Sequence, residues 1–175
     1  MEIGMKIGII YATGAGTTRE CASLLAKQFS RHEIILQEIG KDIIDLDAFD
    51  VVIVGFSIRM GKAIKAARRF IKSNKDKLAG MRSGYFICCG LVDCFDEYAQ
   101  KALPKELYDS AMDIACFGGS LDYSKFRGFD RLLVRTIRNE ILGGGDNADQ
   151  RSDMALPTIF EINISQFADS VKQKI

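Results

Sequence analysis

The stretch "YATGAGTT", Tyr11 to Thr18, decides the fold because it joins an apolar run to a segment with helical spacing. The preceding run contains Ile7, Ile9 and Ile10, and the stretch itself holds two glycines and three threonines but no lysine. A turn of this kind between a strand and a helix places free amides and hydroxyls at the helix N-terminus, which is a site for an anion. The alternative is an ordinary strand-to-helix turn capped by a threonine.

Strand-like and helix-like segments alternate along the rest of the chain. Helical spacing predicts helices at 18–30, 63–72, 97–110, 129–142 and 163–174, and Pro104 divides the third of them. Further strands are predicted at 34–39, 51–56, 84–89 and 114–117. The run 51–56, "VVIVGF", is apolar and β-branched, as in a strand covered on both faces. The alternation predicts an α/β fold with a five-stranded parallel sheet of order 2-1-3-4-5, whose ligand crevice lies at the carboxyl ends of strands one and three.

Composition limits the range of functions. The 175 residues suit a single domain spanning 1–175, and 24 basic against 23 acidic residues give a net charge of +1, which favours no nucleic acid partner. The five cysteines lack metal-ligand spacing, so we expect reduced, mostly buried thiols, no metal and a cytoplasmic location. His32, the one histidine, lies among polar residues and is predicted to be a surface residue. No apolar stretch approaches the ~18 residues of a membrane span.

Three other kinds of phosphate site fit the opening loop less well. A P-loop needs a lysine that the loop lacks. Gly14 and Gly16 match the first two glycines of a dinucleotide-binding motif, but Arg19 occupies the position of its third glycine. Glu38 lies near the position of the acid that binds the ribose in such motifs, so this alternative stays open. A phospho-receiver domain needs an aspartate at the end of its third strand, which reads Gly55-Phe56-Ser57 instead.

The loop resembles the FMN phosphate loop of flavodoxins, in which an aromatic-ended strand leads into a turn rich in hydroxyls and glycine. Neutral donors hold the phosphate in that family, which would explain the missing lysine. The resemblance implies that the phosphate-binding residues are Thr13, Gly14, Ala15, Gly16, Thr17 and Thr18. Ala15 departs from the pattern, because many flavodoxins carry a hydroxyl residue there.

Three segments taken together resemble a flavodoxin-like subgroup, the quinone-dependent protoporphyrinogen oxidases (protoporphyrinogen IX dehydrogenases). They are Thr18–Ala22 at the entry to the first helix, Ser57–Gly61 after the third strand, and Phe117–Ile137, "FGGSLDYSKFRGFDRLLVRTI". The third segment is an insertion relative to ordinary flavodoxins. The resemblance implies a flavodoxin-like three-layer sandwich with an inserted basic helix after strand five.

The resemblance also implies which residues flank the flavin ring. They form two loops, Ser57, Ile58, Arg59, Met60 and Gly61 after strand three and Gly90, Leu91, Val92 and Asp93 after strand four. Arg59 is the candidate flavin tuner, because a cation near the reduced, anionic flavin raises its potential; the alternative is a solvated loop arginine. Further candidates for contact with the ring are Met60, Leu91, Val92, Phe95 and Tyr98, and ordinary packing is the favoured alternative for any one of them. Cys94 has either a redox role or none.

An FMN-dependent oxidoreductase that oxidises protoporphyrinogen IX with a quinone-type acceptor is the function that the resemblance implies. The alternatives are a flavodoxin-type electron carrier and a regulatory module that binds an FMN-like ligand. Balanced charge favours the enzyme, since carrier flavodoxins are characteristically acidic. On the helix predicted between 126 and 142, one face carries Arg127, Arg131, Arg135 and Arg138. We expect this face to meet substrate carboxylates or the inner face of the membrane as a peripheral contact; a solvated basic face is the alternative.

Overall fold

A single twisted sheet organises the molecule in the computed structural model, which describes residues 4–119 and 159–175. Its five parallel strands run in the order β2-β1-β3-β5-β6. The strands are β1 (Lys6–Ala12), β2 (Glu33–Glu38), β3 (Val51–Arg59), β5 (Arg82–Cys88) and β6 (Ile114–Cys116). The short β4 (Lys62–Ala63) pairs antiparallel with the end of β3. The predicted order 2-1-3-4-5 of the parallel strands is therefore confirmed.

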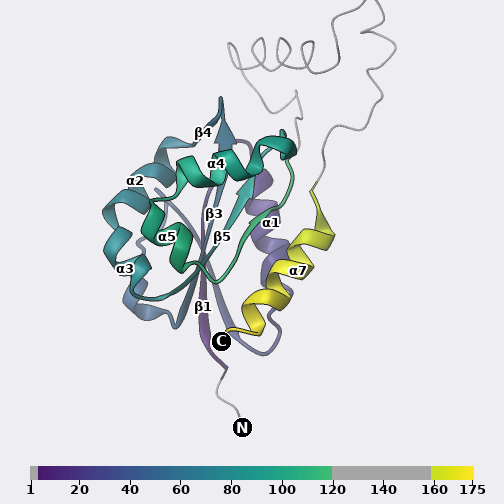
Figure 1. Ribbon diagram of the computed structural model, residues 1–175. Coiled ribbons are helices and arrows are strands. Elements are labelled where there is room, and N and C mark those ends of the chain that lie inside the picture. The colour runs from purple at the N-terminus through teal and green to yellow at the C-terminus, as the bar shows by residue number, and fades with distance from the viewer. Residues whose placement is uncertain (1–3, 120–158) are drawn as a thin grey trace, which may run out of the picture.

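Helices cover both faces of the sheet and complete three layers (Figure 1). One face is covered by α1 (Thr17–Ala26) and α7 (Glu161–Lys172). The other is covered by α2 (Lys65–Ser73), α3 (Lys75–Ala79), α4 (Phe95–Ala102) and α5 (Lys105–Ser110). Two short 3₁₀ helices, η1 (Leu46–Ala48) and η2 (Val92–Cys94), lie in the connections.

Alternate residues of each central strand serve the two separate cores. In β1, Ile7 and Ile9 belong to the core beneath α1 and α7, whereas Ile10 belongs to the core beneath α2 to α5. This alternation follows from the two-residue period of a strand. All three isoleucine side chains are fully buried, so the strand is covered on both faces as its apolar run predicts.

The structure differs most from the predicted boundaries in three places: α1 ends at Ala26 instead of residue 30, α3 was not predicted, and β4 changes the elements around it. The third strand continues three residues further than predicted, to Arg59, because Ser57 pairs with β5 and the last two residues pair with β4. The next helix begins at Lys65 instead of Ala63 for the same reason. Pro104 precedes α5 and separates it from α4, as predicted. The predicted helix at 129–142 lies outside the described residues.

Among the described residues, no helix is both long enough and apolar enough to cross a membrane.

Candidate functional site

The loop between β1 and α1 leaves several amides without acceptors. Gly16 directly precedes the helix with φ 96°, a left-handed conformation that favours glycine. The first helical hydrogen bond runs from Glu20 N–H to the Gly16 carbonyl, at 3.1 Å. The N–H groups of Thr17, Thr18 and Arg19 come before that bond and have no acceptor among the described residues. The loop therefore presents unpaired donors at the positive end of the helix dipole.

Thr13 shapes this loop through its side chain. Its Oγ1 accepts a hydrogen bond from Gly16 N–H at 2.9 Å. The Gly16 amide is thus used within the loop, whereas the Thr13 hydroxyl hydrogen remains able to donate to a ligand. A methyl group added at Gly14 would meet no other atom within 4 Å, so the loop borders open space there.

Thr18 has a buried side-chain hydroxyl that lacks a hydrogen-bond partner in the described part of the chain. The residue as a whole is fully buried. An unpaired buried hydroxyl costs about 1–3 kcal/mol. The Cys88 thiol is its neighbour, and a hydrogen bond to Cys21 together with burial raises the pKa of Cys88. The Thr18 hydroxyl acts in the opposite direction on that pKa, but the two groups do not reach hydrogen-bond geometry.

The segment Ser57–Gly61 forms the first arm and the turn of a β-hairpin with β4, which corrects the expectation of a loop after strand three. Ser57 to Arg59 belong to β3, and Met60 and Gly61 form a two-residue turn with φ of 51° and 71°. Positive φ at both turn positions matches the twist of a hairpin. The pairs Ile58–Ala63 and Arg59–Lys62 hold its arms together. The hairpin ends the strand with an exposed Met60 at its tip.

The second predicted flavin loop, Gly90–Asp93, follows β5. Because β3 and β5 are parallel neighbours, this loop and the hairpin both lie at the carboxyl-terminal edge of the sheet, where these strands end. Val92 begins η2 and is exposed, and the Cys94 N–H donates to the Leu91 carbonyl at 3.2 Å. The helix that follows this loop, α4, reaches the hairpin through Tyr98, whose ring edge lies 3.7 Å from the position of a Cβ at Gly61. Both predicted loops therefore belong to one region.

Four of the five cysteines form two buried thiol contacts near this edge. Cys88 lies 3.7 Å from Cys21, and Cys89 lies 3.6 Å from Cys116, measured between sulfur atoms. All are free thiols, in keeping with the predicted reduced state. The Cys89 thiol and the backbone N–H groups of Gly118 and Cys89 hold the pKa of Cys116 at about 7, against the opposing effect of burial. Cys94 is half-buried.

Two sequence candidates have structural roles. Glu38 accepts from Arg19 at 2.6 Å and lies 2.8 Å from the Lys41 ammonium, so its carboxylate already has two cationic partners. Those hydrogen bonds, first Lys41 and then Arg19, lower the pKa of Glu38. His32, predicted to lie on the surface, is half-buried, and its Nδ1 accepts from the Met5 N–H at 3.2 Å. The described residues contain no cluster of three His, Cys, Asp or Glu side chains that could hold a metal.

The described chain before residue 120 meets the described chain after residue 158 at one point, which includes the start of the predicted insertion, Phe117–Ile137. Gly118 and Ile159 form an antiparallel bridge, and the Phe160 N–H donates to the Phe117 carbonyl at 3.0 Å. A Cβ at Gly119 would lie 3.2 Å from the Gly90 nitrogen, so this junction adjoins the second predicted flavin loop. The four arginines of the predicted basic helix, Arg127, Arg131, Arg135 and Arg138, lie outside the described residues.

Comparisons with known proteins agree with this arrangement. A family model described as a flavodoxin domain matches residues 8–149. The protoporphyrinogen IX dehydrogenase (quinone) of Escherichia coli strain K12 is 29% identical over 168 residues, covering 86% of each chain. An enzyme of the same name from Leishmania major is 24% identical over 151 residues, covering 79% of this chain and 64% of the relative.

Solved structures add evidence for the fold alone. A Fusobacterium nucleatum flavodoxin bound to flavin mononucleotide superposes with a TM-score of 0.55 at 13% identity, covering 98% of this chain and 99% of that one. The parallel sheet, its strand order and the family match over most of the sequence lead to one assignment. The chain belongs to the flavodoxin domain family.

Proposed function

We propose that the chain binds FMN, with the phosphate held by the loop from Thr13 to Thr18. The observation that carries this proposal is the fully buried Thr18 hydroxyl, which lacks a partner among the described residues and lies in the first turn of α1 beside unpaired amides. A phosphate oxygen would accept from these donors, and the helix dipole would favour its charge. The flavin mononucleotide bound by the Fusobacterium nucleatum flavodoxin, which shares this fold, supports the same ligand.

The remaining site residues would orient the flavin and control access to it. FMN, when bound, supplies the electron-transfer chemistry. The hairpin Ser57–Gly61 and the segment Gly90–Asp93 emerge at one sheet edge and would flank the ring. Ile58, Met60, Leu91 and Val92 supply apolar surface, of which Met60 and Val92 are exposed. Arg59 would place positive charge near the ring and favour the reduced, negatively charged cofactor.

We further propose that the protein is an FMN-dependent oxidoreductase acting on protoporphyrinogen IX with a quinone acceptor. Each oxidation would remove two electrons and two protons from the porphyrinogen and convert one quinone to a quinol. The two relatives, both named protoporphyrinogen IX dehydrogenase (quinone), support this substrate and acceptor. The near-neutral charge balance also favours it over an acidic electron carrier.

Calorimetry and an oxidation assay test the two parts separately. The purified protein should bind FMN more tightly than riboflavin, which lacks the phosphate, and take on a flavin visible spectrum. The FMN-loaded protein should then oxidise protoporphyrinogen anaerobically when a quinone is supplied. Equal affinity for FMN and riboflavin would overturn the phosphate site. FMN binding with no porphyrinogen turnover, but with electron exchange with a redox protein, would support the carrier instead.

A peripheral contact with the inner face of the membrane, through Arg127, Arg131, Arg135 and Arg138, completes the proposal. Each arginine near an anionic lipid surface contributes about 1 kcal/mol. The variant Arg131→Glu with Arg135→Glu should lose binding to phosphatidylglycerol vesicles at low salt and retain FMN. Lys27→Glu with Arg31→Glu, two exposed residues at the end of α1 and just beyond it, is the matched charge reversal. Equal vesicle binding by the parent and both variants would refute the membrane contact.

A further inference from the structure

A groove separates α2 from α4 on the face opposite α1. It has a volume of about 610 Å³, which lies within the ~300–1,000 Å³ of small-molecule sites. Its apolar lining comes from both sides, with the residues Ala63, Ile71, Ala102, Leu103 and Pro104. Ala63, Ile71 and Leu103 are buried, so the floor belongs to the folded core. The groove is a cavity with an apolar base and an open mouth.

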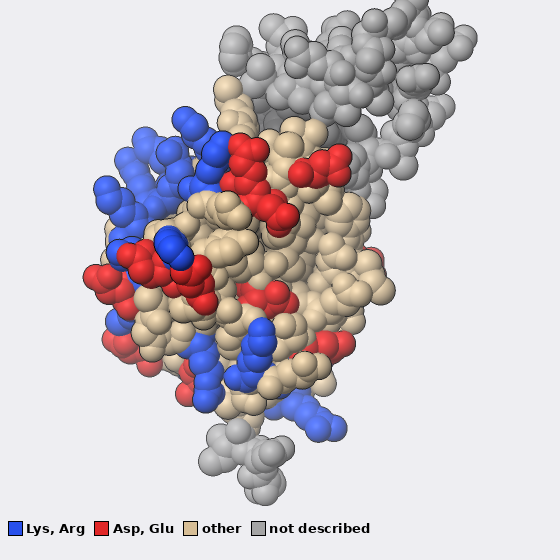
Figure 2. Space-filling model, viewed as in Figure 1, with Lys and Arg blue, Asp and Glu red and all other residues tan. Residues whose placement is uncertain are grey.

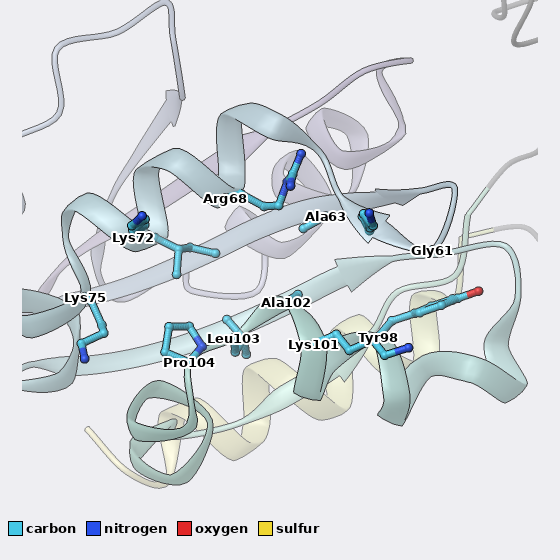
Figure 3. Close-up of a pocket in the computed structure, with 12 residues that line it drawn as sticks. Gly61, Ala63, Arg68, Lys72, Lys75, Tyr98, Lys101, Ala102, Leu103 and Pro104 are labelled. Carbon is cyan, nitrogen blue, oxygen red and sulfur yellow. The ribbon is translucent and has the colours of Figure 1, made fainter.

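Cations surround this apolar base. Figure 3 shows Arg68 and Lys72 on the α2 side and Lys101 and Tyr98 on the α4 side. Lys75 pairs with Glu106 at 3.1 Å, and Lys101 pairs with Glu97. Lys62, Arg68 and Lys72 are exposed and have no carboxylate partner in the described part of the chain. The rim therefore retains positive charge that the described carboxylates do not neutralise.

The charge is segregated along the chain as well as in space. Between residues 59 and 82 the one acidic residue is Asp76. The basic residues of that segment are Arg59, Lys62, Lys65, Arg68, Arg69, Lys72, Lys75, Lys77 and Arg82. Figure 2 shows a dense group of basic side chains over α2, although the whole chain carries a net charge of only +1. Such a concentration favours an anionic ligand at this position.

We propose that this groove binds a small, mainly apolar molecule that carries at least two carboxylates. The floor would hold the apolar body, while Arg68 and Lys72 on one wall and Lys101 on the other would meet the carboxylates. The pair of Lys101 with Glu97 is solvent-exposed and therefore weak, so a ligand carboxylate can compete for this ammonium. Cations on opposite walls suit two separated anionic groups better than one. Gly61 of the hairpin and Tyr98 both line the groove, so it adjoins the region assigned to the flavin.

The inference rests on the proposed function where it names the ligand: the groove would receive the carboxylated side chains of the porphyrinogen. The test uses binding alone, because protoporphyrin IX, the stable oxidised form, requires no turnover. Its dimethyl ester keeps the ring and removes both charges. A failure of porphyrinogen oxidation would leave this binding measurement intact, and a failure of groove binding would leave the oxidation assay intact.

Two double variants of the full-length, FMN-reconstituted protein separate the groove from the basic surface around it. Arg68→Gln with Lys72→Gln removes two charges from the rim. Lys65→Gln with Arg69→Gln removes two from the same helix at exposed positions that do not line the groove. An ion pair between one exposed cation and a ligand carboxylate is weak on its own, so the rim variant removes two cations together. We expect it to bind protoporphyrin IX about tenfold more weakly in a fluorescence titration at low salt. The matched variant should bind within about twofold of the parent, and the ester should bind all three proteins equally.

Two outcomes would overturn the inference. If both double variants lose affinity equally, the α2 surface attracts anions diffusely and the groove is not a site. If the rim variant keeps its affinity for protoporphyrin IX but loses binding to phosphatidylglycerol vesicles, the cations contact lipid instead. Thermal melting of each variant checks that the fold is retained.

Discussion

Arg19 donates to Glu38 over 2.6 Å and so ties the first turn of α1 to the end of β2. Arg19 stands where a dinucleotide-binding loop would carry its third glycine, and Glu38 stands near the place of its ribose-binding acid. In this chain the two residues bind each other, and Lys41 adds a second cation at 2.8 Å. The pairing engages the acid that the dinucleotide alternative needed, which favours the proposed FMN site over a dinucleotide site.

Replacing Glu38 with Gln should lower stability at pH 7 by less than about 1 kcal/mol, because the Arg19 and Lys41 side chains are 49% and 65% exposed and solvent screens the pair. Hydrogen bonds from Lys41 and Arg19 depress the pKa of Glu38 below its ordinary 4.5. The stabilisation is therefore present above pH 4.5 and lost as pH falls through the folded-state value. Urea unfolding at several pH values should show the two proteins converging in acid; a constant difference would exclude this linkage.

Replacing Thr18 with Val should weaken FMN binding while leaving the ligand-free protein as stable as before, or more so. Valine keeps the shape and removes a buried hydroxyl that has no partner among the described residues. A hydrogen bond to a charged phosphate contributes about 1.5–3 kcal/mol, or roughly ten- to 150-fold in affinity. Calorimetry with FMN and riboflavin measures this. Thr18→Ser should restore most of the affinity, and an equal loss for riboflavin would place Thr18 away from the phosphate.

Replacing Arg59 with Gln should lower the two-electron reduction potential of the bound flavin. Arg59 ends β3 at the hairpin, and a cation there would favour the negatively charged reduced cofactor. Arg82→Gln is the matched control, because Arg82 begins β5 and so lies at the end of the sheet where the parallel strands start, opposite the hairpin. If potentiometry gives the same potential for the parent and Arg59→Gln, Arg59 does not tune the flavin.

Replacing Gly55 with Ala should destabilise the fold strongly. A Cβ at Gly55 would lie 1.9 Å from the Phe86 ring, which is stacked on Phe117 with centroids 4.7 Å apart. Overpacking of this kind costs about 1–3 kcal/mol or more. Gly14→Ala is the matched substitution, since no other atom lies within 4 Å of its added Cβ, and its melting temperature should stay near that of the parent. Similar melting temperatures for both variants would show that Phe86 can move aside.

Patterns that depend on neighbouring residues could be predicted from the sequence. The apolar run Ile7–Ile10 and the β-branched run 51–56 are buried strands, and Pro104 does separate two helices. These features are local, so propensity and periodicity are sufficient to identify them. The strand order is not local; it was predicted because five strands alternating with helices suit the known doubly wound order 2-1-3-4-5.

Features that depend on an unusual backbone conformation, or on contacts between distant parts of the chain, could not be predicted. β4 escaped prediction because its pairing depends on a turn with positive φ at Met60, a residue that rarely adopts it. The groove between α2 and α4 brings together Lys62 and Lys101, which lie too far apart in the sequence for a local pattern to relate them. The unpaired state of the Thr18 hydroxyl is likewise a property of its surroundings, whereas its presence in the loop could be seen in the sequence.

The bridge between Gly118 and Ile159 has a consequence for how such a protein can diverge. Because the chain leaves the sheet and returns to it at the same point, β6 and α7 keep their positions whatever length of chain runs between them. Lengthening a connection whose ends are fixed costs little, since the closure entropy grows only with the logarithm of its length. The length and composition of the chain between residues 119 and 159 can therefore change in evolution while β6, α7 and the loop after β1 keep their places.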